Sequence, residues 1–328
     1  MMSSSSVRTT ADGPGLAPVA LVAGASRGLG LLTARELHHR GYIPVLGARS
    51  ETELRAATDQ LARDGISAHA KVMDVGDVEQ VEAVVAGVER EIGPIEVLLC
   101  VAGVIQVGPL TALDRADFVQ AVDVMLWGPI NTALAVLPAM RRRGHGRIGI
   151  VSSVGGLISA PHLLPYSTAK HGAVGFSRGL RSELAGTGIS VTTVAPGLMR
   201  TGSHLRAQFR GDLRREYAWF ATAATMPVLS MDAARAARRI VNGVLKGRPV
   251  VVTTPLAQVA PRVDALAPRL GAGVLSLTAR LLPTWPADSA DRPRAEGWQV
   301  EEQLAPGPRT LLRRLTTLGR RAAVRTNE

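Results

Sequence analysis

Tyr166 and Lys170 have the spacing that first suggests chemistry, because residues four positions apart in a helix share one face. Lysine is scarce in this chain, which contains three lysines and three tyrosines. A free phenol has a pKa of about 10, and an ammonium group beside it favours the phenolate and lowers that pKa. A phenol tuned in this way can give a proton to a carbonyl oxygen or take one from an alcohol. The hydroxyl of Ser153 would donate to the same oxygen, where charge develops.

A second motif decides between this chemistry and a plain amphipathic helix that carries Tyr166 and Lys170 for solubility. From Val19 to Gly30 the chain reads V-A-L-V-A-G-A-S-R-G-L-G, an apolar run followed by glycines and then by a helical pattern. Glycines let the backbone approach a pyrophosphate, and the N-terminus of the following helix favours negative charge. The spacing is G-x-x-x-G-x-G, so on its own this motif is weak.

Together these motifs resemble the classical short-chain dehydrogenase/reductase family over Pro18 to Thr254. The resemblance implies a Rossmann-type domain that moves hydride between NAD(P) and a carbonyl or hydroxyl carbon. It implies Ser153, Tyr166 and Lys170 as the catalytic residues, with Lys170 also holding the nicotinamide ribose. It implies further cofactor contacts from Gly24, Ser26, Arg27, Gly28, Leu29, Gly30, Arg49, Asp74, Val75, Ala102, Gly103, Tyr166, Lys170, Pro196, Gly197 and Thr201.

The end of the expected second strand, Ile43 to Ala48, bears on cofactor choice. An NAD site usually places an acid there for the ribose 2′-hydroxyl, whereas NADP sites use arginine for the 2′-phosphate. Here Ala48 is followed by Arg49, and Arg27 adds a second cation in the glycine loop. We therefore expect NADP(H), although Arg49 could also simply cap a solvated turn.

Other contacts implied by the resemblance carry their own alternatives. Asp74 would hold the adenine amino group and Val75 would touch the ring, but Asp74 could also cap the helix Val78 to Glu91. Pro196-Gly197 would lie along the nicotinamide, and Thr201 would contact its carboxamide or the phosphates. The backbone would pass close to the cofactor at Ala102-Gly103.

The chain departs from the family pattern in two places. Cys100-Val101 stands where the family usually has two asparagines, and Met125 stands where an N-x-x-G asparagine holds a water next to the catalytic lysine. Asn131 lies about 240° around the helix axis from Met125 and faces elsewhere. Either the proton relay uses another water path, or the chain has become a cofactor binder that no longer catalyses.

Alternating apolar runs and helical patterns predict an α/β fold. We expect a Rossmann-type, doubly wound sheet of seven mostly parallel strands, with helices on both faces and a helical C-terminal extension. The expected strands after the first are Ile43 to Ala48, Ala68 to Met73, Val97 to Val101, Arg147 to Ser152, Ile189 to Val194 and Pro249 to Thr253, and a long helix is expected from Phe118 to Met140.

Residues 1–17 are expected to be a disordered leader, residues 18–254 the NADP-binding catalytic domain, and residues 255–328 an extension. Within the domain, residues 202–227 form the variable substrate lid. Three aromatic residues there either line the substrate pocket or pack the lid: Tyr217, Trp219 and Phe220. His204, His162 and Trp127 are further pocket candidates, but a lone His or Trp is more often structural.

The extension divides further. Residues 283–308 are polar and rich in proline, which predicts flexibility. Residues 309–325 form a basic amphipathic pattern that fits either an anionic membrane or docking on the domain, and Gly319 weakens it as a free helix. We favour docking or disorder. The dinucleotide domain is expected to be complete without residues 306–328.

Composition narrows the class of protein. The net charge is +11, but the arginines are scattered and no nucleic-acid motif appears, so nucleic acid is not an expected partner. Cys100 is the single cysteine, which excludes a disulfide framework and a cysteine-rich metal site, and no metal is expected. No run of about 20 apolar residues and no signal peptide are seen, so we expect a cytoplasmic protein. The family resemblance implies a homodimer or homotetramer.

The leading hypothesis is an NADP(H)-dependent oxidoreductase that interconverts a carbonyl compound and a secondary or primary alcohol, with Tyr166 as acid and base. One alternative is a non-catalytic NADP(H)-binding sensor or scaffold, against which the intact set of Ser153, Tyr166 and Lys170 argues. Another is a membrane-surface reductase of a lipid-like substrate. The substrate itself cannot be read from the sequence.

Overall fold

A seven-stranded parallel sheet forms the centre of the computed structural model, which describes residues 18–226, 230–289 and 291–327. The sequence-based expectation for residues 1–17 lies outside the described residues. The strand order is β11-β7-β6-β4-β1-β2-β3, so the chain winds outward in both directions from β1 and β4. The strands are β1 (Val19–Ala23), β2 (Ile43–Ala48), β3 (His69–Val72), β4 (Ile95–Cys100), β6 (Gly146–Val151), β7 (Ile189–Ala195) and β11 (Val250–Val252).

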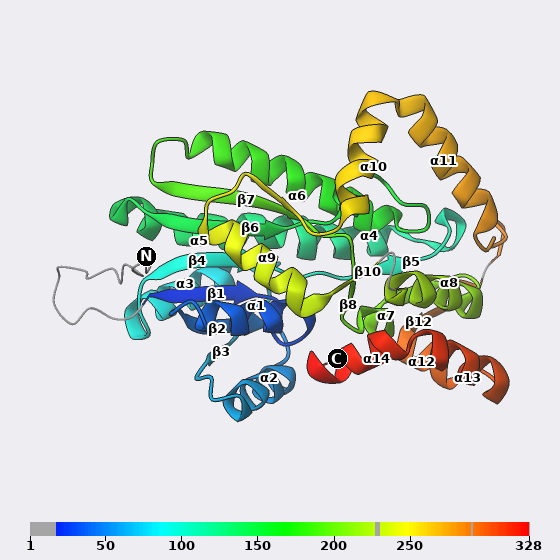
Figure 1. Cartoon of the computed structure of the whole chain (residues 1–328), viewed down its shortest axis with the longest axis horizontal. Helices are drawn as coiled ribbons and strands as arrows, with labels where there is room; N and C mark the ends of the chain where they lie inside the picture. Colours follow the sequence, from blue (N-terminus) through cyan, green and yellow to red (C-terminus); the bar gives the residue numbers. More distant parts are fainter. Residues whose placement is uncertain (1–17, 227–229, 290, 328) are drawn as a thin grey trace, which may run out of the picture.

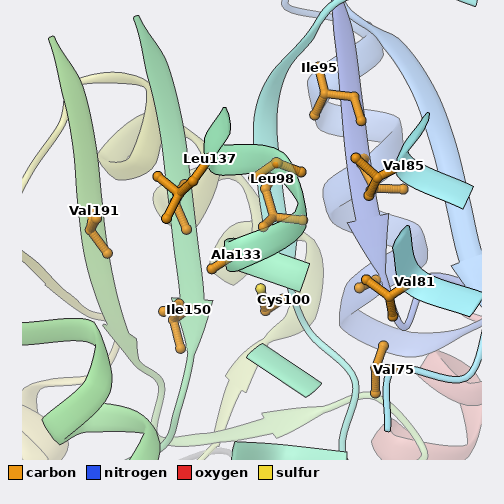
Figure 2. Packing of buried hydrophobic residues seen from close by; sticks show 14 of the residues in the cluster. Val75, Val81, Val85, Ile95, Leu98, Cys100, Ala133, Leu137, Ile150 and Val191 are labelled. Carbon is orange, nitrogen blue, oxygen red and sulfur yellow. The ribbon is translucent and has the colours of Figure 1, made fainter. Parts of the chain in front are cut away.

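Helices cover both faces of this sheet (Figure 1). On one face, α3 (Val78–Glu91), α5 (Gly128–Arg143) and α6 (Leu164–Glu183) pack against the strands through a single apolar cluster, part of which Figure 2 shows. On the other, α1 (Gly28–His38), α2 (Glu51–Arg63) and α9 (Ala233–Leu245) pack through a second cluster. The strand runs are apolar on both sides because both faces are buried. The expected doubly wound fold is confirmed.

The long helix expected from Phe118 to Met140 is a continuous stretch of three parts. It comprises α4 (Arg115–Val122), a π-helical turn (Asp123–Trp127) and α5. By length and composition this stretch could cross a membrane, contrary to the sequence-based expectation, although half of its most apolar window is buried inside the protein. Since α5 packs on β4 and α3, the stretch also fits a core helix of the domain.

Distant segments join residues 202–226, the described part of the segment expected to be a substrate lid and called the lid below. A small sheet has the order β12-β9-β5, in which β9 (Gln208–Arg210) lies between β5 (Gln106–Val107) and β12 (Arg294–Glu296). Helices α7 (Ser203–Arg206) and α8 (Leu213–Thr225) pack beside it, and β8 (Leu198–Arg200) pairs with β10 (Ser230–Asp232).

The extension leaves the domain and then returns to it. Helices α10 (Pro255–Leu266) and α11 (Pro268–Leu281) project from the body (Figure 1). The chain then comes back through β12, α12 (Gly297–Glu302), α13 (Pro306–Leu315) and α14 (Thr317–Arg325), of which α12, α13 and α14 all pack on α8. The structure thus differs from the expectation of a flexible segment at residues 283–308, because β12 completes a sheet. We favoured docking or disorder for residues 309–325, and of these two the structure has docking on the domain.

A buried carboxylate fastens the returning helices to the lid. Glu301 is 4% exposed and accepts hydrogen bonds from the Tyr217 hydroxyl at 2.7 Å, Arg313 Nε at 2.7 Å and Arg320 Nη1 at 2.5 Å. Burial by itself raises the pKa of Glu301, but the hydrogen bonds from Tyr217 and Arg313 and the charges of the two arginines outweigh it, so the pKa is lowered. The ionised carboxylate therefore stabilises the docked extension.

Gly319 has a packing reason to be glycine. A β-carbon at this position would lie 2.4 Å from Thr225 Cγ2 and 3.2 Å from His204 Cε1. The absence of a side chain lets α14 approach α8 closely, which offsets the cost of glycine inside a helix.

We expect Glu301→Gln to lower the free energy of unfolding by about 1–3 kcal/mol at pH 7, because the charge-assisted hydrogen bonds to both arginines are lost. A group whose pKa is depressed in the folded state contributes stability above its unfolded pKa and loses it as the pH falls. The difference between the variant and the wild type is therefore full at pH 7 and shrinks below the ordinary value of 4.5.

Urea denaturation followed by circular dichroism at pH 7 and pH 4 measures both effects. The matched control is Glu302→Gln, the exposed neighbour. A destabilisation that is equal for both variants, or that does not depend on pH, contradicts the assignment.

Candidate active site

A groove of about 630 Å³ runs along the carboxyl ends of the central strands. Its walls come from the glycine loop after β1, the segments after β2, β3, β4, β6 and β7, the start of α6 and the lid. Parallel strands deliver the segments that follow them to one edge of the sheet, which is where doubly wound folds bind ligands. All the residues named above as catalytic or cofactor-binding line this groove.

Ser153 and Tyr166 face each other in the groove. Ser153 follows β6, and its Oγ accepts the N–H of Gly155 at 3.0 Å, which starts a short 3₁₀ turn. Tyr166 lies in the first turn of α6, and its phenol shares a hydrogen bond with Ser153. Two hydroxyl groups therefore converge on one point, as is needed to bind and protonate a single carbonyl oxygen.

Lys170 lies one turn further along α6, with 4% of its surface exposed. Its Nζ donates a hydrogen bond to the carbonyl oxygen of Val151 at 2.7 Å and lies 5.8 Å from the centroid of the Tyr166 ring. Burial lowers the pKa of Lys170 to about 8, while the coulombic effect of Cys100 acts in the opposite direction. At pH 7 the amine still carries its proton for most of the time.

The electrostatics of Tyr166 differ from the sequence-based expectation. Burial raises the pKa of this phenol, the hydrogen bond with Ser153 acts in the opposite direction, and the net shift is upward. The expected lowering by Lys170 is not seen, because the ammonium group is turned toward the Val151 carbonyl rather than toward the hydroxyl. In this state the phenol is set up to be protonated at neutral pH.

Met125 replaces a polar neighbour of Lys170 with an apolar one. Its side chain is fully buried, and its sulfur and Lys170 Nζ both approach Gly103, where an added β-carbon would lie 3.6 Å and 3.9 Å from them. The amide of Asn131 instead donates to the Val75 carbonyl at 3.0 Å. The expectation that Asn131 faces away from the lysine is therefore confirmed.

The glycine loop lies against the segment after β4. Gly24 has φ +91°, and a β-carbon there would lie 2.4 Å from the backbone nitrogen of Ala102. This close approach of the two backbones exists although Val101 lacks the side-chain amide of the asparagine that the family usually has there. It leaves the N-terminus of α1 pointing into the groove, where an anion is favoured.

The far end of the groove holds the charges that bear on a 2′-phosphate. Arg49 is exposed at the rim, and the N-cap of α2 is Ser50, so Arg49 is not the cap. Arg27 is paired with Glu53 at 2.6 Å, and the Ser26 hydroxyl also donates to Glu53 at 3.1 Å. Glu53 thus forms an ion pair with Arg27, one of the two cations expected to bind the 2′-phosphate. This ion pair was not predicted from the sequence.

Asp74 does not cap α3, because the cap is Asp77, whose carboxylate accepts the Gln80 N–H at 3.1 Å. Asp74 instead accepts the Gly76 N–H at 2.9 Å at the edge of the groove. The alternative in which Asp74 serves as the helix cap is therefore wrong.

The segment after β7 is fixed by its neighbours. The carbonyl of Pro196 accepts the Val154 N–H at 2.8 Å, and Gly197 N–H donates to Thr253 Oγ1 at 3.3 Å. Thr201 is buried, and its hydroxyl accepts the Ser203 N–H at 3.2 Å.

Of the aromatic and histidine candidates, Phe220 lines the groove. Tyr217 binds Glu301, and Trp219 Nε1 and His162 Nδ1 both bind the fully buried Glu216, at 2.7 Å and 2.8 Å. His204 is buried beside Tyr217, and Trp127 is 51% exposed. These side chains pack the lid or the surface, as lone His and Trp residues more often do.

Three charged residues of the groove were not predicted: Glu53, Arg206 and Glu296. Arg206 Nη2 lies 3.7 Å from Glu53 and its Nη1 lies 3.8 Å from Glu296, so it links α2 to β12. Glu53 stands three positions after Ser50, and this S-x-x-E spacing is typical of a helix start, which is a signal that could have placed it beside the glycine loop. Across the described residues, no group of three or more His, Cys, Asp or Glu side chains could hold a metal ion.

Comparisons with known proteins agree with this geometry. The family model for short chain dehydrogenases matches residues 18–209. A Streptomyces coelicolor protein named as a ketoacyl reductase is 40% identical over 185 residues, which cover 56% of this chain and 71% of that protein. The 3-oxoacyl-(acyl-carrier-protein) reductase FabG of Escherichia coli is 33% identical over 183 residues, or 56% of this chain and 74% of that protein.

Solved structures extend the similarity. A variant of actinorhodin polyketide ketoreductase with NADPH superposes with a TM-score of 0.65 at 30% identity, covering 73% of this chain and 97% of that one. A short-chain dehydrogenase from Streptomyces avermitilis gives a TM-score of 0.69 at 27% identity, covering 82% of this chain and 98% of that one.

Proposed function

The chain belongs to the short-chain dehydrogenase family, and from this premise we propose that it is an NADP(H)-dependent reductase of a carbonyl compound, or a dehydrogenase of the corresponding alcohol. The observation that carries the proposal is the convergence of the Ser153 and Tyr166 hydroxyls in the groove that the glycine loop also lines. A protein that only bound a nucleotide would have no use for this pair.

The residues of the groove fit a nicotinamide dinucleotide. The N-terminus of α1 and the glycine loop, which line the groove, would hold its pyrophosphate, Asp74 and Val75 its adenine, and Lys170 its nicotinamide ribose. When bound, the reduced cofactor supplies a hydride to the carbonyl carbon.

The chain's own residues would bind and protonate the carbonyl oxygen of the substrate. Ser153 donates a hydrogen bond to the carbonyl oxygen, which orients it and stabilises the negative charge that develops there. Tyr166 transfers its phenolic proton to that oxygen, so the product is an alcohol and the tyrosine becomes a phenolate. The ammonium group of Lys170 donates to the Val151 carbonyl, but it lies 5.8 Å from the centroid of the Tyr166 ring, and from there its charge would stabilise the phenolate until a proton from solvent replaces the one transferred. The alcohol is oxidised by the reverse sequence.

Substrate identity rests on the shape of the lid. Phe220 and Ala224 of α8 and Ile105 contribute apolar side chains to the wall of the groove. The relatives named as ketoacyl reductases make a ketoacyl thioester a rational member of a test panel, beside simple ketones and aldehydes.

Cell location and assembly remain part of the proposal. We propose a reducing cytoplasm as the location, because a chain with the single cysteine Cys100 has no disulfide framework. The exposed apolar residues Val119, Trp127 and Leu134 on the long helix suit pairing of two copies.

Tyr166→Phe is expected to abolish turnover while NADPH binding stays within about twofold of the wild type, because the change removes the proton donor and little volume. NADPH absorbance with a panel of ketones, aldehydes and a ketoacyl thioester measures turnover, and fluorescence titration measures binding. Normal turnover by the variant contradicts the mechanism. A wild type that binds NADPH but turns over no carbonyl compound favours the non-catalytic sensor or scaffold.

Cofactor preference is expected to follow the charges at the rim. NADP(H) binds at least about tenfold more tightly than NAD(H), since charge-assisted hydrogen bonds to the 2′-phosphate contribute about 1.5–3 kcal/mol. Arg49→Ala lowers this ratio. Glu53→Gln raises it, because the 2.6 Å pair that engages Arg27 loses its negative charge. Arg55→Ala, an exposed arginine of the same helix, is the control. Equal affinities, or a ratio that none of these changes moves, contradict the assignment.

A second candidate function is a reductase that works at a membrane surface on a lipid-like substrate. Helix α11 is 14 residues long and contains no buried residue. Its apolar side chains recur at helical spacing and are 57–79% exposed, and they continue a stripe on α10; the exposed residues are Val259, Val263, Leu266, Leu270, Val274, Leu277 and Leu281. An isolated helix of this length is marginal in water, so a surface that covers the stripe would stabilise it.

Charge favours an anionic bilayer as that surface. Between Pro255 and Leu281 the chain carries Arg262, Arg269 and Arg280 against one acid, Asp264. Basic residues that flank an apolar stripe are the pattern of helices lying in a membrane interface. Thr254, the N-cap of α10, lies against Gly197 of the groove, so the bilayer would meet the protein near the site.

Co-sedimentation with phosphatidylglycerol vesicles is expected for the wild type, with weaker binding to phosphatidylcholine vesicles and loss in the double variant Leu270→Ser/Leu277→Ser. Leu110→Ser removes a 66% exposed leucine elsewhere and serves as control. No sedimentation with either vesicle rejects this second function. A dimer that the double variant dissociates identifies another copy of the chain as the cover instead.

A further inference from the structure

The last described residues of the chain lie directly against the glycine loop. The carbonyl oxygen of Thr326 accepts the Gly28 N–H at 2.7 Å, and Asn327 Nδ2 donates to the carbonyl of Ser26 at 2.8 Å. We propose that Thr326 and Asn327 are positioning residues of the cofactor site. This inference rests on the proposed function, because it concerns the same groove.

Helix α14 delivers these two residues to the loop. Its packing on α8 and β8 is close at Gly319, and Gln60 Nε2 of α2 donates to the Arg325 carbonyl at 2.8 Å where the helix ends. Thr326 is 2% exposed, and Asn327 has φ +59°, a left-handed conformation that asparagine tolerates better than most residues. The chain therefore turns inward at a defined point.

Together the two residues tie three cofactor-binding segments to one another. The Thr326 hydroxyl lies 2.8 Å from the Thr201 carbonyl, in the segment after β7. Asn327 Nδ2 is also 3.3 Å from the carbonyl of Glu53 in α2. The glycine loop is thus joined to the segment of Thr201, which is expected to contact the cofactor, and to α2, which carries Glu53.

The contacts support the groove without filling it. Neither Thr326 nor Asn327 is among the described residues that line the groove, whereas Gly28, Ser26 and Thr201 are. Within the described chain, no protein acceptor faces the N–H of Leu29, so the next donor at the start of α1 stays available for an anion. Thr326 therefore takes up the Gly28 N–H and leaves the Leu29 N–H available, and Thr326 and Asn327 hold the loop without themselves lining the groove.

A glycine loop needs such support because its backbone is costly to order. Fixing one residue costs about 1–2 kcal/mol of conformational entropy, and glycine loses more freedom than other residues. A loop that is already ordered before the ligand arrives binds it more tightly, because the entropy cost of ordering the loop no longer reduces the free energy of binding. Asn327 brings an amide to this loop in a chain where Cys100 and Val101 bring none to the neighbouring segment.

The test uses the full chain with the double variant Thr326→Val/Asn327→Ala, which removes both side-chain links and keeps the helix. We expect the Kd for NADPH to rise about fivefold or more, and KM for NADPH to rise more than KM for the carbonyl substrate. Hydrogen exchange at the amides of residues 24–30 is expected to become faster in the absence of cofactor.

Two single variants separate positioning from general stability. Thr326→Ser keeps the hydroxyl and is expected to bind NADPH within about twofold of the wild type. Thr310→Val removes the same kind of hydroxyl from α13, where its bond at 2.8 Å goes to the carbonyl of Pro306, and is expected to leave binding unchanged.

Unchanged NADPH affinity and unchanged loop exchange in the double variant overturn the inference. Tighter binding overturns it as well, because the tail would then obstruct the site. If the wild type itself binds neither NADPH nor NADH, the proposed function fails, and loop exchange in the cofactor-free protein still tests the tail.

Discussion

The candidate active site depends on two hydrogen bonds between the first turns of α6 and the end of β6. Lys170 Nζ donates to the Val151 carbonyl at 2.7 Å, and the main-chain carbonyl of Lys170 accepts the Ser152 hydroxyl at 2.8 Å. Gly156 makes this possible, since a β-carbon there would lie 2.3 Å from Ser152 Oγ and 2.5 Å from the Lys170 carbonyl. Ser153 follows β6, and Tyr166 precedes Lys170 by one turn of α6. The two hydrogen bonds that join Lys170 to β6 therefore also bring the hydroxyls of Ser153 and Tyr166 together.

Local patterns were enough to predict the sheet and the meeting of Tyr166 and Lys170 in one groove, since both depend on short-range signals. Apolar runs mark buried parallel strands, and four-residue spacing places Tyr166 and Lys170 on one helix face. The strand β12 and the burial of Glu301 were not predictable in this way, because each needs partners more than 80 positions away. A polar, proline-rich segment gains order only when a distant strand or a pair of arginines satisfies it, and composition does not carry that information.

The environment of Met125 bears on whether the site works. The methionine sulfur and the lysine ammonium approach Gly103 from the same side, so a water held by this position would have only a thioether to bond with. Lys170 instead satisfies one of its three donors with the Val151 carbonyl, and its lowered pKa of about 8 reflects the loss of water around it. In the proposed reaction, a relay that replaces the proton on Tyr166 would therefore use the groove, since Met125 offers a water only a weak acceptor.

Helix α8 connects the extension to the chemistry. Phe220 lines the groove from this helix, while Tyr217, one turn earlier, donates its hydroxyl to Glu301 of the extension. Phe209 of β9 packs edge-on against both rings, with centroids 5.5 Å and 5.8 Å away. The extension is thus in continuous contact with the apolar wall of the groove through Tyr217, Phe209 and Phe220. Of the extension's helices, α14 ends at the glycine loop, where Thr326 and Asn327 contact Gly28 and Ser26. The extension therefore contacts both the aromatic rings behind the apolar wall and the glycine loop of one groove.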